Sequence, residues 1–236
     1  MYLSRLLLDP RSREAGRDLG DVHQMHRTVM SAFPQVKEQV EARADLAVLH
    51  RLDIDQRSSN VALLVQSGEE PDWSCLPEGY LFNVGSEGRN PATKSISDAL
   101  VTLRKGQVLR FRLRANPTKK IDTKSGPDGQ RRNGRRVDLR TETQQIEWLS
   151  RRADRAGFRL VPVYPGSNAP AVRVGASEKL RGRTTNRRVT LAGVLFDGLL
   201  EVTDPDKLRL AIREGIGPGK AFGCGLLSLA PRGRWT

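Results

Sequence analysis

The chain has 236 residues, of which 37% are hydrophobic and 28% charged, and its formal net charge is +13. This size suffices for one large domain or two smaller ones, and the composition is typical of a globular protein. The sequence contains no run of roughly 18 consecutive apolar residues, so a protein that spans a membrane with helices is not expected. The segment MYLSRLLLDP is too short and too quickly charged for a signal peptide.

The two cysteines, Cys75 and Cys224, form neither a metal-binding spacing nor a disulfide framework. We therefore expect a cytoplasmic protein with reduced thiols, and no metal ion or other cofactor.

The charge is distributed unevenly along the chain. Residues 1–100 carry 11 Lys and Arg against 15 Asp and Glu, whereas residues 101–236 carry 29 against 12, a net charge of +17. A balance of this kind predicts a polyanionic partner, either nucleic acid or an anionic membrane surface, that binds mainly to the second part. A basic surface that serves only solubility does not require this asymmetry.

The first part begins with a strand pattern and continues with a helix. Asp21 is a suitable N-cap for this helix, and Pro34 is expected to end it. The short segment after Ser95 predicts a further small helix. The expected elements are a strand over 1–9, a helix over 20–33, and strands over 46–54, 60–66 and 80–84.

The second part opens with a strand over 107–114, in which apolar and basic residues alternate, so that one face is buried and the other is offered to a polyanion. A basic hairpin or loop over 118–140 follows. The remaining elements are a helix over 141–157, strands over 158–164, 171–174 and 189–202, a helix over 204–214 and a strand over 226–229. This order predicts an α+β protein made of two tandem ferredoxin-like βαββαβ domains, residues 1–95 and 105–236.

A glycine-rich loop connects the last predicted helix and strand. Its sequence GIGPGKAFGCG places five glycines in residues 215–225, where they permit positive φ angles and a nest of N–H groups for an anion. A helix C-cap with a tight turn would need only one or two glycines. The order of helix, loop and strand excludes a Rossmann loop, and the missing Lys-Ser/Thr pair excludes a Walker loop. We expect Gly217, Gly219 and Lys220 to contact phosphate.

Two histidines, His23 and His26, lie one turn apart on the first predicted helix, so they share a face. Histidine transfers protons near neutral pH, so the pair is a candidate acid–base site. A pair of surface histidines is the plain alternative, and a metal site lacks a third ligand nearby in the sequence. His50 falls in a strand pattern and is expected to be structural.

Further basic residues are candidates for RNA contacts, because arginine forks suit phosphates and the grooves of an RNA stem. Each of them taken alone can equally be a solvated charge. The candidates are Arg27, Lys119, Lys120, Arg131, Arg132, Arg135, Arg136, Arg181, Arg183 and Arg187.

Four segments resemble a known family. The glycine-rich loop is similar to that of the RAMP superfamily of CRISPR-associated RNA-binding proteins. Within this superfamily, the segments MYLSRLLLD, DVHQMHRTVMSAFP, RFRLRANPTKK and GIGPGKAFGCGLLSL together resemble the CasE (Cse3) family of endoribonucleases. They occur in the family's order and span almost the full chain.

The resemblance implies an endoribonuclease that binds the hairpin of a CRISPR repeat and cuts precursor CRISPR RNA at the 3′ base of the stem. It implies that His26, within D-x-x-Q-x-H, is the catalytic histidine and that His23 replaces a tyrosine. It further implies retention of the product within Cascade, beside the backbone subunit. The alternative is a RAMP-fold RNA-binding subunit without cleavage activity, which the basic second part would fit equally well.

Overall fold

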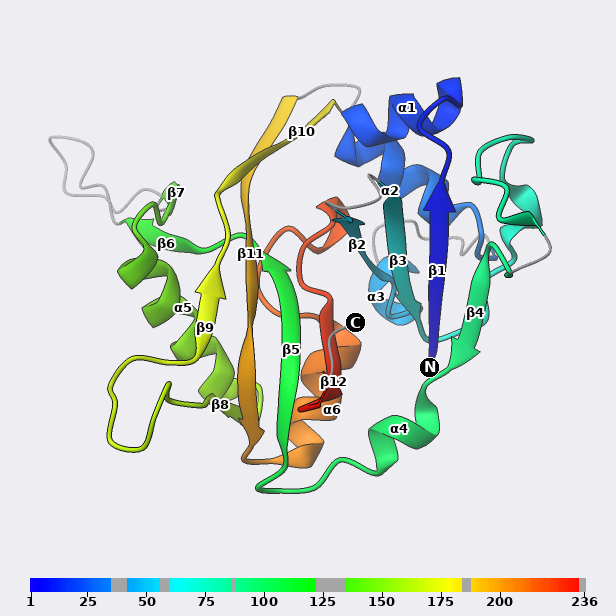
Figure 1. The fold of residues 1–236 in the computed structure, drawn as a ribbon. Helices are drawn as coiled ribbons and strands as arrows, with labels where there is room; N and C mark the ends of the chain where they lie inside the picture. Colours follow the sequence, from blue (N-terminus) through cyan, green and yellow to red (C-terminus); the bar gives the residue numbers. More distant parts are fainter. Residues whose placement is uncertain (35–41, 56–59, 86–87, 122–134, 184–187, 234–236) are drawn as a thin grey trace, which may run out of the picture.

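The computed structural model describes residues 1–34, 42–55, 60–85, 88–121, 135–183 and 188–233. Two antiparallel sheets stand side by side, the first built from the beginning of the chain and the second from the remainder (Figure 1). Each has its own hydrophobic core. This confirms the α+β class with antiparallel sheets. The division at residues 95 and 105 remains a prediction.

The first sheet has the strand order β2-β3-β1-β4, which is the ferredoxin-like order. Its strands are β1 (Tyr2–Leu8), β2 (Leu49–Ile54), β3 (Val61–Ser67) and β4 (Ala92–Ser95). The strand predicted over 80–84 is wrong. It reduces to one isolated bridge between Leu8 and Leu81, because β4 occupies the edge of β1 from Tyr2 to Arg5.

The helix predicted over 20–33 is present over Val22–Met30 with Asp21 as its cap, and a helix that was not predicted precedes it over Arg13–Gly20. Asp21 adopts an extended conformation, with φ of −142° and ψ of 107°, which ends one helix and caps the next. The helices are α1 (Arg13–Gly20) and α2 (Val22–Met30), followed by the short α3 (Ala42–Asp45). The segment between β3 and β4 contains the short helix η1 (Trp73–Cys75). The short helix expected after Ser95 is α4 (Ser97–Val101).

The second sheet has the corresponding order β10-β11-β5-β12, with β8 and β9 also paired to β11. Helices α5 (Glu142–Arg155) and α6 (Pro205–Glu214) cover the far face of this sheet in Figure 1. The strands are β5 (Val108–Ala115), β8 (Phe158–Leu160), β9 (Val172–Val174), β10 (Glu178–Arg183), β11 (Arg188–Val202) and β12 (Leu227–Pro231). Strand β10 was not predicted, because its sequence EKLRGR has almost no apolar alternation.

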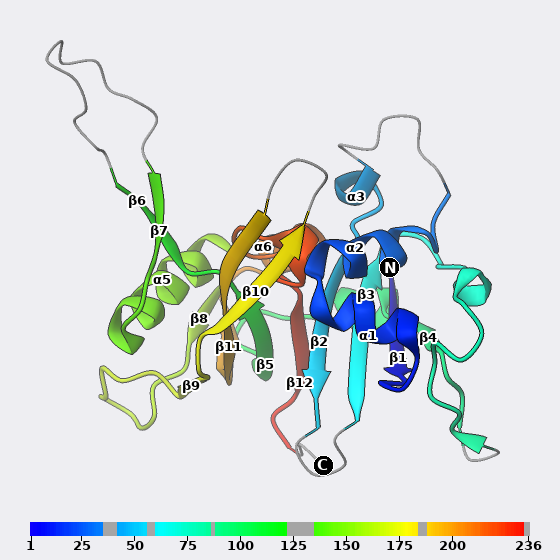
Figure 2. The same ribbon diagram turned by 90° about the horizontal axis from the view of Figure 1, so that it is seen from above.

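The predicted basic hairpin forms a two-stranded ribbon of β6 (Thr118–Ile121) and β7 (Arg135–Asp138). Figure 2 shows that this ribbon leads away from the body of the molecule. Residues 122–134, between its strands, lie outside the described residues.

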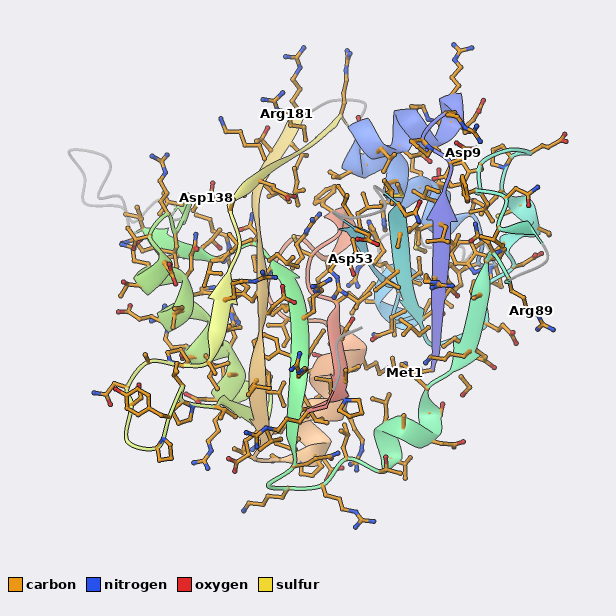
Figure 3. All side chains as sticks on the ribbon, in the orientation of Figure 1. Met1, Asp9, Asp53, Arg89, Asp138 and Arg181 are labelled. Atoms are coloured by element: carbon orange, nitrogen blue, oxygen red, sulfur yellow. The ribbon has the colours of Figure 1, made fainter. Side chains whose placement is uncertain are left out.

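A buried arginine joins the two sheets. The side chain of Arg51, on edge strand β2, is 1% exposed and bonds to both carboxylate oxygens of Asp53, at 2.8 and 2.9 Å. Its Nη1 atom also donates to the carbonyls of Arg112 and Leu226 in the second half, both at 3.1 Å. Figure 3 shows Asp53 in the space between the sheets. A nearby buried bond, from Gln66 Nε2 to the carbonyl of Ile212, crosses the same interface at 2.7 Å.

Replacement of Arg51 by methionine keeps the apolar stem but leaves Asp53 and two carbonyls without the guanidinium. We expect the free energy of unfolding, measured by urea denaturation, to fall by about 3–5 kcal/mol. The matched control is Arg173→Met, because Arg173 is 79% exposed and bonds to Asp197 at 3.3 Å. Such a surface pair contributes about 0–1 kcal/mol. Equal losses in the two variants would contradict the assigned role of Arg51.

Candidate active site

Helix α2 is fixed at its start by Asp21. The Asp21 Oδ1 atom accepts hydrogen bonds from the backbone N–H groups of His23, at 2.8 Å, and Gln24, at 3.2 Å. Met25 and Val29 are buried in the first core and set the rotation of the helix. The Nδ1 atoms of His23 and His26 are both buried, and neither has a hydrogen-bond partner in the described part of the chain.

The same aspartate ties α2 to the second half. Its Oδ2 atom accepts a hydrogen bond from the backbone N–H of Arg183, on β10, at 3.0 Å. Gly182 is buried, and a Cβ atom at this position would lie 3.0 Å from Val22 Cγ2 and 3.1 Å from the backbone nitrogen of His23. The glycine therefore permits the close approach of β10 to the first turn of α2.

The glycine-rich loop contacts both α2 and β2 through its short helix η3 (Lys220–Phe222). All five glycines have positive φ, between 79° and 95°, as predicted. At Gly217 the reason is also steric, because a Cβ atom would lie 2.9 Å from the ring of Trp148. The loop thus brings Lys220, from the second half, to the histidine helix of the first.

The expected anion nest is smaller than the sequence suggested. The N–H groups of Ile216 and Gly225 donate to the carbonyls of Gly225 and Arg114, and those of Phe222 and Cys224 donate to Gly219. These four N–H groups hold the loop together and are not available to a phosphate. Contacts of Gly217, Gly219 and Lys220 with phosphate remain a prediction.

His26 lies in an environment that disfavours its charged form. Burial, Arg43 and His23, in this order of importance, lower the pKa of His26 from 6.5 to about 4. Arg43, on α3, is held by a hydrogen bond from Nη1 to the carbonyl of Val48 at 3.2 Å. Burial and Arg43 also lower the pKa of Lys220. Among the described residues, no salt bridge joins Arg43 or Lys220 to a carboxylate, so an anion is the natural complement of this cluster.

Arg43 and His50 were not recognised as site residues. Arg43 belongs to a four-residue helix that no sequence pattern marks. His50 is buried in β2, as a structural residue would be, but its ring lies 6.1 Å from that of His26 with an interplanar angle of 19°. Only the fold brings these three residues together.

The predicted RNA-contact residues fall into separate groups. Arg27 is exposed on α2, and Arg181 and Arg183 are exposed on β10 beside the start of this helix. Figure 3 shows Arg181 at the top of the molecule. The ribbon, remote from α2 in Figure 2, presents the exposed side chains of Lys119, Lys120 and Arg136. The backbone of Arg135 belongs to β7, and Arg131, Arg132 and Arg187 lie outside the described residues.

The basic face expected on the strand over 107–114 is largely neutralised. Arg112 bonds to Asp197 at 2.6 Å, and Arg114 bonds to Glu178 at 3.1 Å. Because carboxylates already satisfy these arginines, this face of β5 is a poor candidate for a polyanion.

No three His, Cys, Asp or Glu residues of the described ranges cluster as a metal site would require. No helix in the same ranges is long and apolar enough to cross a membrane.

Two aspartates allow a controlled test of how α2 is positioned. Asp204 caps α6 as Asp21 caps α2, through bonds to the N–H groups of Asp206 and Lys207. We expect alanine at either position to lower the free energy of unfolding by about 1 kcal/mol. Only Asp21→Ala should shift the imidazole NMR signals of His23 and His26. Unchanged histidine signals in Asp21→Ala would show that the cap does not set the geometry of the pair.

The comparisons with known proteins agree over nearly the whole chain. The model of a family described as "CRISPR associated protein" matches residues 1–231. The CRISPR-associated endoribonuclease Cse3 of Thermus thermophilus is 38% identical over 237 residues, which cover 98% of this chain and 100% of that protein. The CRISPR system Cascade subunit CasE of Escherichia coli is 31% identical over 239 residues, with coverage of 98% and 100%.

A solved structure of the CRISPR endoribonuclease Cse3 bound to 19 nt RNA has a TM-score of 0.78 and 38% identity to this chain. The matched region covers 98% of this chain and 100% of the Cse3 chain in that structure. From the sequence matches and this likeness of fold, we conclude that the chain belongs to the CasE (Cse3) family of CRISPR-associated proteins.

Proposed function

We propose that this protein is an endoribonuclease that binds the stem-loop of a CRISPR repeat and cleaves precursor CRISPR RNA without a metal ion. The observation that carries the proposal is the position of His26, a half-buried imidazole beside Arg43 and near the glycine-rich loop. A phosphodiester would pair with Arg43 and Lys220, neither of which forms a direct salt bridge among the described residues, although Glu214 acts on Lys220 from a greater distance. The relative from Thermus thermophilus is named an endoribonuclease, and a Cse3 structure contains RNA.

The proposed reaction needs only groups of this site. His26, neutral in the free protein, accepts the proton of a ribose 2′-OH, and the oxygen attacks the adjacent phosphorus. The bond from phosphorus to the 5′-oxygen breaks, and this oxygen takes up a proton. The products are a 2′,3′-cyclic phosphate and a 5′-OH. Arg43 and Lys220 stabilise the charge on the phosphorane.

His23 has a supporting role in this proposal. It is one turn from His26 and contributes to the lowered pKa of that residue. It is therefore suited to protonate the leaving oxygen or to position the phosphate. Tyr80 does not substitute for the tyrosine of the family, because it is buried and its hydroxyl donates to Asp18 at 3.0 Å.

The RNA stem is bound by the second half in this proposal. The exposed Lys119, Lys120 and Arg136 of the ribbon are proposed to contact an A-form stem, and so are Arg131, Arg132 and Arg135. Arg27 on α2, Arg181 and Arg183 on β10, and Arg187 are proposed to bind the RNA between the stem and His26. The cut then falls at the 3′ base of the stem.

The partner complex is proposed to be Cascade, since the relative from Escherichia coli is named a Cascade subunit. The cleaved hairpin stays bound to the second half and keeps the protein beside the backbone subunit. The site of action is the cytoplasm, which agrees with the free thiols of Cys75 and Cys224.

The role of His26 is tested by His26→Ala with a cognate repeat RNA in EDTA. We expect the single-turnover cleavage rate to fall by a factor of about 10²–10⁴, because a general acid or base is removed, while the affinity for the stem is retained. End-group analysis of the wild-type products should identify the cyclic phosphate. A wild-type cleavage rate in His26→Ala would remove this histidine from the mechanism. Stem binding without cleavage by the wild type would favour the non-catalytic alternative.

The pH dependence tests the state of His26. The base form of the group is required, so kcat/KM should be constant above the pKa and fall as the pH drops through it. With a pKa of about 4 in the free protein, we expect a flat profile from about pH 5 to 7 and a tenfold fall per pH unit below about 4. Circular dichroism at each pH controls for acid unfolding. An acid-side fall in kcat/KM that already begins near pH 6.5 would contradict the lowered pKa of His26.

A further inference from the structure

His50 is a buried titratable residue that the proposed reaction does not use. His50 belongs to strand β2 and is only 2% exposed. Its ring borders a cavity between the two halves and is therefore not packed on all sides. A residue retained only to fill the core would more commonly be apolar. The position of this ring therefore requires another explanation.

The ring of His50 contacts both parts of the proposed active site. It lies nearly parallel to the His26 ring, with 6.1 Å between centroids and 19° between planes. This is within the range of offset ring pairs. On the other side of the site, a Cβ atom at Gly223 would lie 3.7 Å from His50 Nε2 and 3.8 Å from its Cδ2. The His50 ring therefore lies beside Gly223, and a side chain at residue 223 would touch it.

The surroundings of His50 are cationic. Burial contributes most to lowering the pKa of His50 to about 3, followed by His26 on α2, Arg114 on β5 and Arg43 on α3. Lys179 and Arg181 of β10 line the same cavity as His50 and add positive charge, and Glu178 pairs with Arg114. Helix η3, which carries Lys220, also contacts β2. The ring is therefore neutral at physiological pH. It fills the space beside His26 without adding a charge that would repel a protonated His26.

We propose that His50 is a positioning residue for RNA cleavage, which holds the His26 ring and the Gly223 end of the glycine-rich loop in their reactive arrangement. The inference rests on the proposed function of the site. It assigns to His50 no contact with RNA and no proton transfer. Its effect is transmitted through the orientation and the desolvation of His26.

The position of β2 supports this role. His50 precedes Arg51, whose guanidinium joins the two sheets, and successive residues of a strand point to opposite faces. The strand is therefore fixed on one side by the Arg51 bonds while it presents His50 to α2 and the loop on the other. His50 also lines a cavity of about 490 Å³ between the halves, together with Arg114, Phe222 and Gly223. Loss of the ring would open the site to this cavity.

The inference is tested with His50→Ala and His50→Phe in the full-length protein. In His50→Ala we expect the single-turnover cleavage rate to fall about 10–100-fold, because misplacement of a reacting group by an ångström has this scale of effect. The dissociation constant of a non-cleavable repeat RNA with a 2′-deoxy cut site should change less than about twofold. His50→Phe restores a flat ring, so its rate should recover to within about threefold of the wild type.

A titration of His26 followed by NMR separates positioning from stability. Water that enters the space left in His50→Ala weakens the desolvation of His26, so the pKa of His26 should rise from about 4 toward 6.5. It should stay low in His50→Phe. Leu200→Ala, which creates a cavity in the second core, is the control for a loss of stability. Leu200 is fully buried in β11 and takes no part in the site.

Two results would overturn the inference. One is a wild-type cleavage rate in His50→Ala with an unchanged His26 titration. The other is an equal loss of rate in Leu200→Ala, which would reduce the effect to stability. If the wild-type protein did not cleave repeat RNA at all, the proposed function would fail, and the His26 titration would still decide whether His50 controls that ring.

Discussion

The arrangement of the two halves depends on the hydrogen bonds of the Arg51 guanidinium. It satisfies a carboxylate of its own strand, a carbonyl of β5 and the carbonyl of Leu226, which precedes β12. A buried charge is tolerated only when its donors are paired, so the two sheets cannot slide without a large penalty. The glycine-rich loop belongs to the second half of the chain and α2 to the first. Their contact, and hence the setting of His26, follows from this alignment.

The parts of the site that the sequence predicted are those with a local signature. The cap at Asp21, the pair His23 and His26, and the positive φ angles of the loop all arise from short-range chemistry that a pattern can express. The ferredoxin-like type of fold was predicted from the order of elements in the second half, although β10 was not predicted and the strand over 80–84 was wrong. Helix α1, which precedes Asp21, was missed because its sequence REAGRDLG offers only Ala15 as a buried apolar residue and therefore shows no apolar stripe.

The remaining parts depend on contacts between distant segments. Arg43, His50 and Lys220 come from α3, β2 and η3, and no spacing in the sequence relates them. Strand β10 has no apolar alternation because it is an edge strand, with Gly182 as its one buried residue. The count of basic residues misled in another way. Several arginines of the second half, such as Arg112 and Arg114, are paired with carboxylates, whereas the cations that act on His26 are not.

The ribbon of β6 and β7 projects from the body of the molecule, and its exposed lysines and arginine are carried outward with it (Figure 2). Long-range attraction of a polyanion acts over about a Debye length, which is roughly 8 Å at physiological ionic strength. A charged projection of this kind enlarges the volume within which a polyanion such as RNA is attracted electrostatically to the protein. Capture is then expected to be faster at low salt, whereas the chemical step proposed for the half-buried His26 should depend little on salt. The molecule thereby separates the speed of encounter from the speed of reaction.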